Sequence, residues 1–147
     1  MKNNETSLTV GIVQDSPVHL DLEASLAKAT AHIEAAARQG AELLVFGETW
    51  LSGYPAWLDY CPNVALWDAE PVKAVFTKMF QNSLTVPGPV TEQLGQLAQQ
   101  HQLSIVIGVN ERGANGFGNR TLYNSLLIFG SDGRLRNHHR KLMPTYT

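Results

Sequence analysis

The feature that most constrains the fold is a short apolar run that ends beside a carboxylate. Residues 43–46 (LLVF) lie between Gly40 and Gly47, and Glu48 follows directly. Such an unbroken apolar run predicts a strand that is buried on both faces. An ionised carboxylate is unfavourable to bury, so Glu48 needs either a partner or a chemical role. It caps the next turn, pairs with a Lys or Arg, or belongs to a site at the carboxyl edge of the sheet, where open α/β sheets carry their chemistry.

A second apolar run precedes the first and predicts the local topology. Residues 8–14 (LTVGIVQ) are expected to form another buried strand. Between the two runs, Asp21 can cap a helix with apolar residues on one face, and Gly40 suits the C-terminal end of that helix. Strand, helix and strand in this order predict parallel strands joined by a right-handed crossover. Asp15 and Glu48 would then lie at the same edge of the sheet.

The rest of the chain continues the α/β pattern. Two further helices are expected, one beginning near Pro71 and one capped by Thr91. Strands are expected over residues 103–109, 121–129 and 135–142. Asp132-Gly133 predicts a hairpin between the last two strands. Glu111 is expected just beyond the end of the first of these three strands.

Composition excludes several classes of function. The chain of 147 residues suits one domain, and its 44% hydrophobic and 16% charged residues are typical of globular proteins. A formal charge of −2 argues against a general attraction to nucleic acid or to an anionic membrane. The N-terminal residues are polar rather than signal-like, and no apolar run is long enough to span a membrane. With a single cysteine, Cys61, these features predict a cytoplasmic protein.

Residues 52–67 are rich in aromatic side chains and predict a loop near the carboxyl edge of the sheet. Tyr54 and Trp57 can wall a pocket for an apolar substrate in that position. The alternative is that these rings pack the loop against the domain or bury against another subunit.

Residues 134–141 carry a basic run that ends in His138, His139, Arg140 and Lys141. Adjacent strand residues point to opposite faces, so the two histidines cannot easily share a metal ion, and no metal site is predicted. Most of the run is expected to be a solvated strand. Lys141 is the exception, because the neighbouring Met143 and Pro144 indicate a less exposed turn.

Four segments, taken together and in this order, resemble the nitrilase family of carbon–nitrogen hydrolases. They are GETWLSGYP at 47–55, IGVNER at 107–112, TLYNSLLIFGSDGRL at 121–135 and HRKLMPT at 139–145. The sequences of these segments resemble those of the true nitrilases more than those of the amidases. The resemblance implies that residues 1–147 are the N-terminal part of a single carbon–nitrogen hydrolase domain. The implied fold is α/β, a nitrilase-type α-β-β-α sandwich that is incomplete in this chain.

The same resemblance implies a Glu-Lys-Cys catalytic set without a cofactor, acting on a small-molecule nitrile. Glu48 matches the family's general base, and Lys141 matches its catalytic lysine. The implied reaction converts a nitrile to a carboxylic acid and ammonia through a cysteine thioimidate and thioester. Glu111 and Asn124 lie in matching motifs. They are expected to hold the catalytic residues in position or to have a structural role. Tyr54 matches an aromatic residue near the family's substrate pocket.

The sequence departs from the family at the nucleophile. The family's cysteine follows the HRKLMPT motif by a distance that exceeds the residues left before Thr147, and Cys61 matches no nucleophile motif. We therefore expect the chain to be inactive by itself, and to act as a homo-oligomer or with a complementary C-terminal segment that carries the Cys. The alternatives are an aliphatic amidase-like hydrolase and a non-catalytic fragment that serves only as an assembly module.

Overall fold

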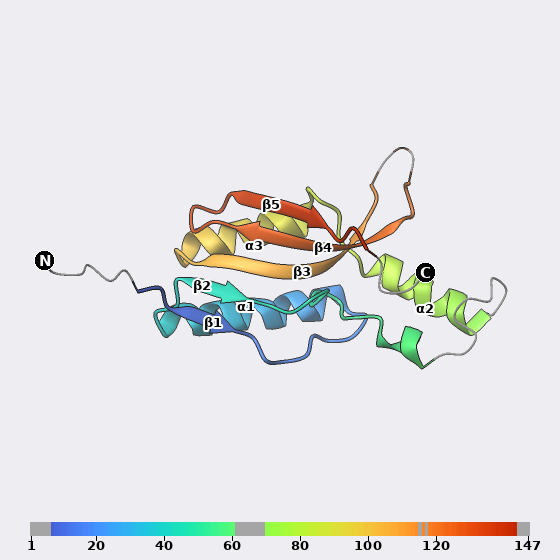
Figure 1. The fold of residues 1–147 in the computed structure, drawn as a ribbon, viewed down its shortest axis with the longest axis horizontal. Helices are drawn as coiled ribbons and strands as arrows, with labels where there is room; N and C mark the ends of the chain where they lie inside the picture. Colours follow the sequence, from blue (N-terminus) through green and yellow to red (C-terminus); the bar gives the residue numbers. More distant parts are fainter. Residues whose placement is uncertain (1–6, 61–69, 115, 117, 144–147) are drawn as a thin grey trace, which may run out of the picture.

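The computed structural model describes residues 7–60, 70–114, 116 and 118–143 (Figure 1). Cys61 lies outside these residues. In chain order the elements are β1 (Val10–Ile12), α1 (Leu22–Arg38), β2 (Leu43–Val45), a short 3₁₀ helix (Ala56–Asp59), α2 (Glu70–Gln81), α3 (Pro89–Gln100), β3 (Ser104–Arg112), β4 (Leu122–Phe129) and β5 (Leu135–Arg140).

The strands form one five-stranded sheet in the order β1-β2-β3-β4-β5. The first three strands run parallel, while β4 and β5 are antiparallel to their neighbours. This arrangement confirms the predicted strand–helix–strand unit and the predicted hairpin at Asp132-Gly133. The predicted cap of α1 is also confirmed, since the Ala24 N–H donates to Asp21 Oδ1 at 2.9 Å.

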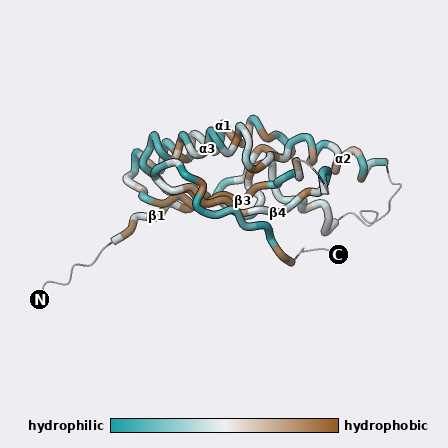
Figure 2. The backbone as a smooth tube through the Cα atoms, turned by 90° about the horizontal axis from the view of Figure 1, so that it is seen from above, coloured by the Kyte–Doolittle hydropathy of each residue, from teal (hydrophilic) through white to brown (hydrophobic). Residues whose placement is uncertain are grey.

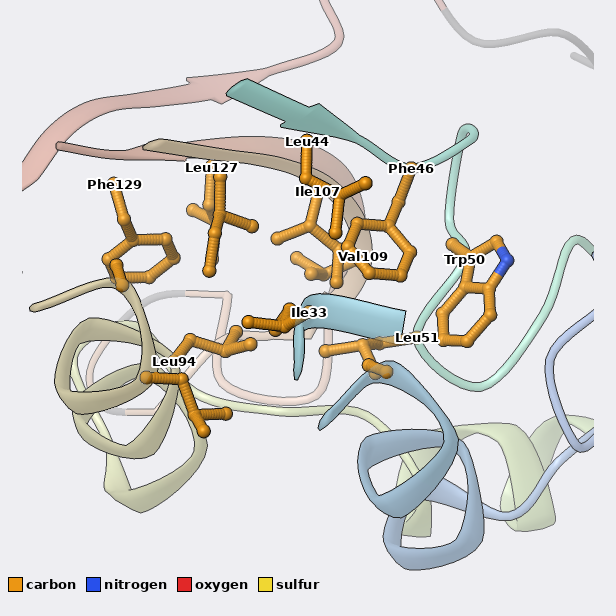
Figure 3. Packing of buried hydrophobic residues seen from close by; sticks show 14 of the residues in the cluster. Ile33, Leu44, Phe46, Trp50, Leu51, Leu94, Ile107, Val109, Leu127 and Phe129 are labelled. Atoms are coloured by element: carbon orange, nitrogen blue, oxygen red, sulfur yellow. The ribbon is translucent and has the colours of Figure 1, made fainter. Parts of the chain in front are cut away.

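Helices α1 and α3 cover one face of the sheet, and the two layers are seen edge-on in Figure 2. The core between them is apolar, and its side chains pack against one another (Figure 3). It includes Ile33 of α1, Leu94 of α3, and Ile107 and Leu127 of the sheet, each 0% exposed. Among the described residues, no helix covers the opposite face, which we call the open face. One helical layer on one sheet is half of an α-β-β-α arrangement, which agrees with the predicted fold class.

The first strand differs from its prediction as a buried element. Leu8, Val10 and Ile12 are 60%, 46% and 73% exposed. The reason is their position, because β1 is the outermost strand and these alternating residues lie on the open face. The intervening Gly11 points the other way, where a Cβ atom would meet Leu44 and Ala36 of the core.

Two predicted element ends are also corrected. Strand β3 does not stop at Val109 but continues through Glu111, which pairs with Tyr123 of β4. The strand can continue through this buried carboxylate because Ser125 and Arg140 donate hydrogen bonds to it. Thr91 is not the cap of α3. Gly88 holds that position, and its N–H donates to the Thr91 hydroxyl at 2.9 Å.

Candidate active site

Glu48 follows β2 in a loop that folds back onto β3. A Cβ atom at Gly108 of β3 would lie 2.4 Å from both Gly47 O and Thr49 N. Only a glycine therefore allows the Glu48 loop to approach the β3 backbone this closely. The Leu51 N–H then donates to Gly108 O at 3.1 Å and fixes the loop. Sequence reasoning missed Gly108, although a glycine inside an apolar strand is a recognised signal of close backbone approach.

Asp15 and Glu48 leave the same edge of the sheet, as predicted, but they have different partners. The Asp15 carboxylate contacts Lys28 Nζ at 2.8 Å and His32 Nε2 at 3.0 Å. Its backbone carbonyl accepts the Trp50 indole N–H at 2.7 Å, which ties the two strand ends together. Asp15 therefore helps to hold the Glu48 loop.

Glu48 meets Lys141, 93 positions away in the chain. Lys141 Nζ donates to Glu48 Oε1 at 2.7 Å, and Asn124 Nδ2 donates to the same oxygen at 2.6 Å. The Lys141 N–H also donates to Asn124 O at 2.8 Å, which continues the β4–β5 pairing one residue beyond β5. The structure thus brings together three of the four residues singled out as catalytic or supporting.

The electrostatics of this cluster favour an ionised carboxylate. The hydrogen bond from Lys141, and then that from Asn124, lowers the pKa of Glu48 below its usual value, while burial opposes the shift. The Glu48 and Lys141 side chains are 47% and 38% exposed. Glu48 is therefore ionised at neutral pH and accessible, as a proton acceptor must be, beside a fixed cation.

The pair lines a cavity of about 280 Å³. Its other lining residues are Gly108, Asn124, Ser125, Leu126 and His139. Gly108, Leu126 and His139 are register neighbours across β3, β4 and β5, so the cavity lies on the open face of the sheet. His139 was considered only as a metal ligand from the sequence, and the structure places it at this cavity instead.

Glu111 lies in a different cluster on the helix-covered face. It is 1% exposed, and its Oε2 accepts from the Ser125 hydroxyl at 2.6 Å and lies 2.7 Å from His138 Nε2. Arg140 Nη2 donates to Oε1 at 2.5 Å. Burial raises the pKa of Glu111, but the hydrogen bonds from Arg140, Ser125 and His138 outweigh it and hold the pKa below its usual value.

The basic run is a largely solvated strand, as predicted, but two of its side chains make contacts that were not expected. All six residues of β5 are exposed by area, yet His138 and Arg140 reach inward to a buried carboxylate. This contact could not be predicted from the sequence, because it depends on β3 continuing to Glu111 beside β4.

Tyr54 and Trp57 do not line the Glu48 cavity. The Trp57 ring makes edge contacts with His19 and Phe76, at centroid distances of 5.4 and 6.4 Å. These contacts match the packing alternative for Trp57, which is held against Phe76 of α2. A substrate-pocket role for Tyr54 and Trp57 remains a prediction. In the part of the chain that the structure describes, no three His, Cys, Asp or Glu side chains are grouped to hold a metal ion.

The fold and the Glu48–Lys141 pair define an α/β protein with a carboxylate and an ammonium at the edge of its sheet. Residues 9–147 match the model of the carbon–nitrogen hydrolase family, and the chain belongs to that family. Within the described ranges, no helix has the length and apolar character needed to cross a membrane.

Similar curated proteins carry nitrilase names. The chain is 38% identical over 138 residues to Nitrilase 2 from an unknown prokaryotic organism, and 36% identical over 142 residues to the bifunctional nitrilase/nitrile hydratase NIT4A of Lupinus angustifolius. An arylacetonitrilase of Aspergillus niger is 34% identical over 141 residues. These matches cover 94%, 97% and 96% of the chain but only 41%, 39% and 38% of the relatives.

Solved structures agree on the fold. An amidase from Nesterenkonia sp. superposes with a TM-score of 0.59 at 19% identity, over 92% of this chain and 43% of the amidase. The NitFhit protein of C. elegans superposes with a TM-score of 0.63 at 18% identity, over 94% of this chain and 29% of that protein. These similarities confirm the predicted nitrilase-type fold.

Proposed function

We propose that this chain supplies the general base and the catalytic ammonium of a nitrilase-type hydrolase, which converts a nitrile to a carboxylic acid and ammonia. The observation that carries the proposal is the 2.7 Å contact between Glu48 and Lys141 beside a shared cavity. Two residues this far apart in sequence meet at the carboxyl edge of the sheet, where α/β proteins carry out their chemistry.

The two charges have complementary tasks in this reaction. The Glu48 carboxylate accepts the proton of a cysteine thiol, and the thiolate attacks the nitrile carbon. One bond of the carbon–nitrogen triple bond breaks, and negative charge develops on nitrogen. The Lys141 ammonium stabilises that charge and the nitrogen takes up a proton, which gives a thioimidate. Water adds, ammonia leaves, and a second water that Glu48 activates hydrolyses the thioester to the acid.

Asn124 and Gly108 support this chemistry through Glu48. Asn124 binds the same carboxylate oxygen as Lys141, which fixes the rotation of the carboxylate. Gly108 allows the loop that carries Glu48 to lie directly on β3. Both act on the position of the base and are assigned no proton-transfer role.

We place the nucleophilic cysteine on a segment outside residues 1–147. The sequence contains one cysteine, Cys61, and it matches no nucleophile motif. We therefore assign the thiol to a segment that packs beside the cavity, and we call the chain together with that segment the complete enzyme. The apolar residues exposed on the open face, including Val10 and Ile12, support such packing or an assembly of several copies.

A nitrile is favoured over an amide as substrate. The curated relatives at 34–38% identity are named nitrilases and arylacetonitrilases. The amidase structures are too distant in sequence to bear on the substrate. Ammonia release from matched nitrile and amide pairs tests the choice in the complete enzyme. We expect faster release from the nitriles, and faster release from the amides would assign the protein to the amidases.

The need for a second segment has its own test. Residues 1–147 are expressed alone and assayed for ammonia release, with light scattering to report their assembly. We expect no nitrile turnover and a self-associated or poorly soluble chain, because the open face exposes apolar residues. A monodisperse monomer whose turnover disappears in Cys61→Ala would instead identify Cys61 as the nucleophile. If the complete enzyme releases no ammonia from any pair, the chain is a non-catalytic assembly module.

A further inference from the structure

We infer that the pairing of Arg140 with buried Glu111 selects the register of β5, and so determines that Lys141 rather than Leu142 lies beside Glu48. The inference rests on the proposed function only for the importance of Lys141. The register itself is a structural property, so its test reads strand pairing and does not depend on activity.

Side chains along β5 point alternately to the two faces of the sheet, so the register decides which cation meets which carboxylate. His138 and Arg140 face the helix-covered side, where they meet Glu111, while His139 and Lys141 face the open side. A shift of one residue in a strand moves every side chain to the opposite face. After the shift that places Lys141 opposite Ser125, Lys141 would face Glu111 and Arg140 would take the place of His139 opposite Leu126. Leu142 would then lie beside Asn124, where Lys141 now meets Glu48.

On the side that faces Glu111, the sequence HHRK leaves only one residue pair to distinguish the two registers. A one-residue shift would replace His138 by His139 beside Glu111, which exchanges one imidazole for another. The same shift would replace Arg140 by Lys141. The difference between a guanidinium and an ammonium opposite Glu111 is therefore the side-chain signal on this face.

The hairpin itself does not fix the register over its whole length. Ile128 pairs with Asn137, but the next residue, Phe129, pairs with Leu135, so Arg136 is an extra residue in β5. An irregularity of this kind changes the pairing by one residue. The pairing at the Lys141 end therefore requires contacts of its own, beyond those of the turn.

Arg140 fits the Glu111 site in a way that lysine does not. Its Nε lies 3.2 Å from both carboxylate oxygens while Nη2 contacts Oε1, so one planar group binds both oxygens. The guanidinium also lies over the Tyr123 ring, 3.9 Å from its centroid. An ammonium has neither the planar fork nor the stacking surface. Since Glu111 is 1% exposed, water does not compensate for a poorer partner.

The test exchanges Arg140 and Lys141 in the complete enzyme. Strand pairing is then mapped by nuclear magnetic resonance. In the wild type, cross-strand backbone contacts should pair Ser125 with Arg140. In the double variant Arg140→Lys, Lys141→Arg, we expect Ser125 to pair with position 141 in all or a substantial part of the molecules. A single set of signals that retains the Ser125 pairing with position 140 would overturn the inference.

Two single variants guard against a double variant that does not fold. Arg140→Lys keeps a cation opposite Glu111, and we expect a second β5 register in roughly a tenth of molecules or more, within the range of detectable minor states. Arg136→Lys, in the same strand but paired with exposed Asp132, should show one register. An unfolded Arg140→Lys chain, or one with a single unchanged register, would contradict the inference, because Arg140 would then serve stability without choosing between registers.

Discussion

Glu48 and Glu111 are two carboxylates that take their cations from adjacent residues of one segment. Glu48 pairs with Lys141 on the open face, and both side chains are more than one third exposed. Glu111 pairs with Arg140 on the helix-covered face and is 1% exposed. The pKa of each carboxyl is lowered by its partners, so ionisation alone does not separate a catalytic pair from a structural one.

Surroundings separate the two pairs. Glu48 has two donors on one oxygen and borders a cavity, whereas both oxygens of Glu111 are occupied by Ser125, His138 and Arg140. An accessible carboxylate can exchange a proton with a substrate or nucleophile. A carboxylate enclosed by donors can only hold them in place. We therefore expect changes at the first pair to affect turnover and changes at the second to affect stability.

The largest expected effect is on turnover when the exposed pair loses its cation. Lys141→Met in the complete enzyme should reduce ammonia release by about 100- to 1,000-fold, because one fixed donor to a developing charge has that effect. The unfolding free energy should change by less than about 1 kcal/mol, as for other exposed ion pairs. Arg38→Met, which removes the cation of an exposed pair with Glu34 in α1, is the matched control and should retain turnover. Similar losses in the two variants would show that Lys141 is not specifically required.

A change in β3 should reach turnover through the position of Glu48. The Cβ atom of Gly108→Ala would lie 2.4 Å from Gly47 O and Thr49 N, so the Glu48 loop must move. A displacement near 1 Å of a catalytic group lowers the rate by up to about 100-fold. Steady-state kinetics should show the loss mainly in kcat. Gly116→Ala is a control for backbone strain without a clash: its φ of +74° disfavours alanine, but no atom lies within 4 Å of its Cβ position, so kcat should stay normal. Normal kcat in Gly108→Ala would show that the loop tolerates the displacement.

Removing the cation of the buried pair should lower stability. Arg140→Met leaves the Glu111 carboxylate enclosed with only Ser125 and His138, and breaking a buried pair in this way costs about 3 kcal/mol. Arg136→Met breaks a pair with exposed Asp132 and should cost less than about 1 kcal/mol. Urea unfolding of both variants gives the comparison. Equal midpoints would mean that Glu111 does not depend on Arg140.

The smallest expected effect is on the pH dependence of stability. The folded pKa of Glu111 is lowered, so its ionised form contributes stability that is fully present above the unfolded pKa of about 4.3. That contribution is lost as the pH falls through the folded pKa. Urea unfolding from pH 7 down to pH 3 should therefore show a shallower acid slope in Glu111→Gln than in the wild type. Identical slopes would place the acid-sensitive group elsewhere.

The sequence was sufficient to predict much of the fold and the exposed pair. Apolar runs predicted the strands, and Asp21 predicted the start of α1. The segments that resemble the nitrilase family indicated Glu48, Lys141 and Asn124, and the structure places these three side chains in contact. A local motif is enough to predict the position of a residue such as Glu48 or Lys141, which follows a strand.

The buried pair and the role of Gly108 depend on tertiary structure. Glu111 was expected beyond a strand end, and only its pairing with β4 shows that it is enclosed. The closeness of Gly108 to the Glu48 loop follows from β2 lying beside β3, which no single segment encodes. The exposure of Val10 and Ile12 likewise follows from the place of β1 at the edge of the sheet.

The most direct test makes the same isosteric change at both carboxylates of the complete enzyme. Glu48→Gln should lower turnover by at least about 100-fold, the usual scale for a general base, with little change in unfolding free energy. Glu111→Gln should cost about 1–3 kcal/mol of stability and reduce turnover far less, because the amide still binds Arg140. Near-normal turnover in Glu48→Gln, measured as ammonia released from a nitrile, would contradict the assignment of Glu48 as the base.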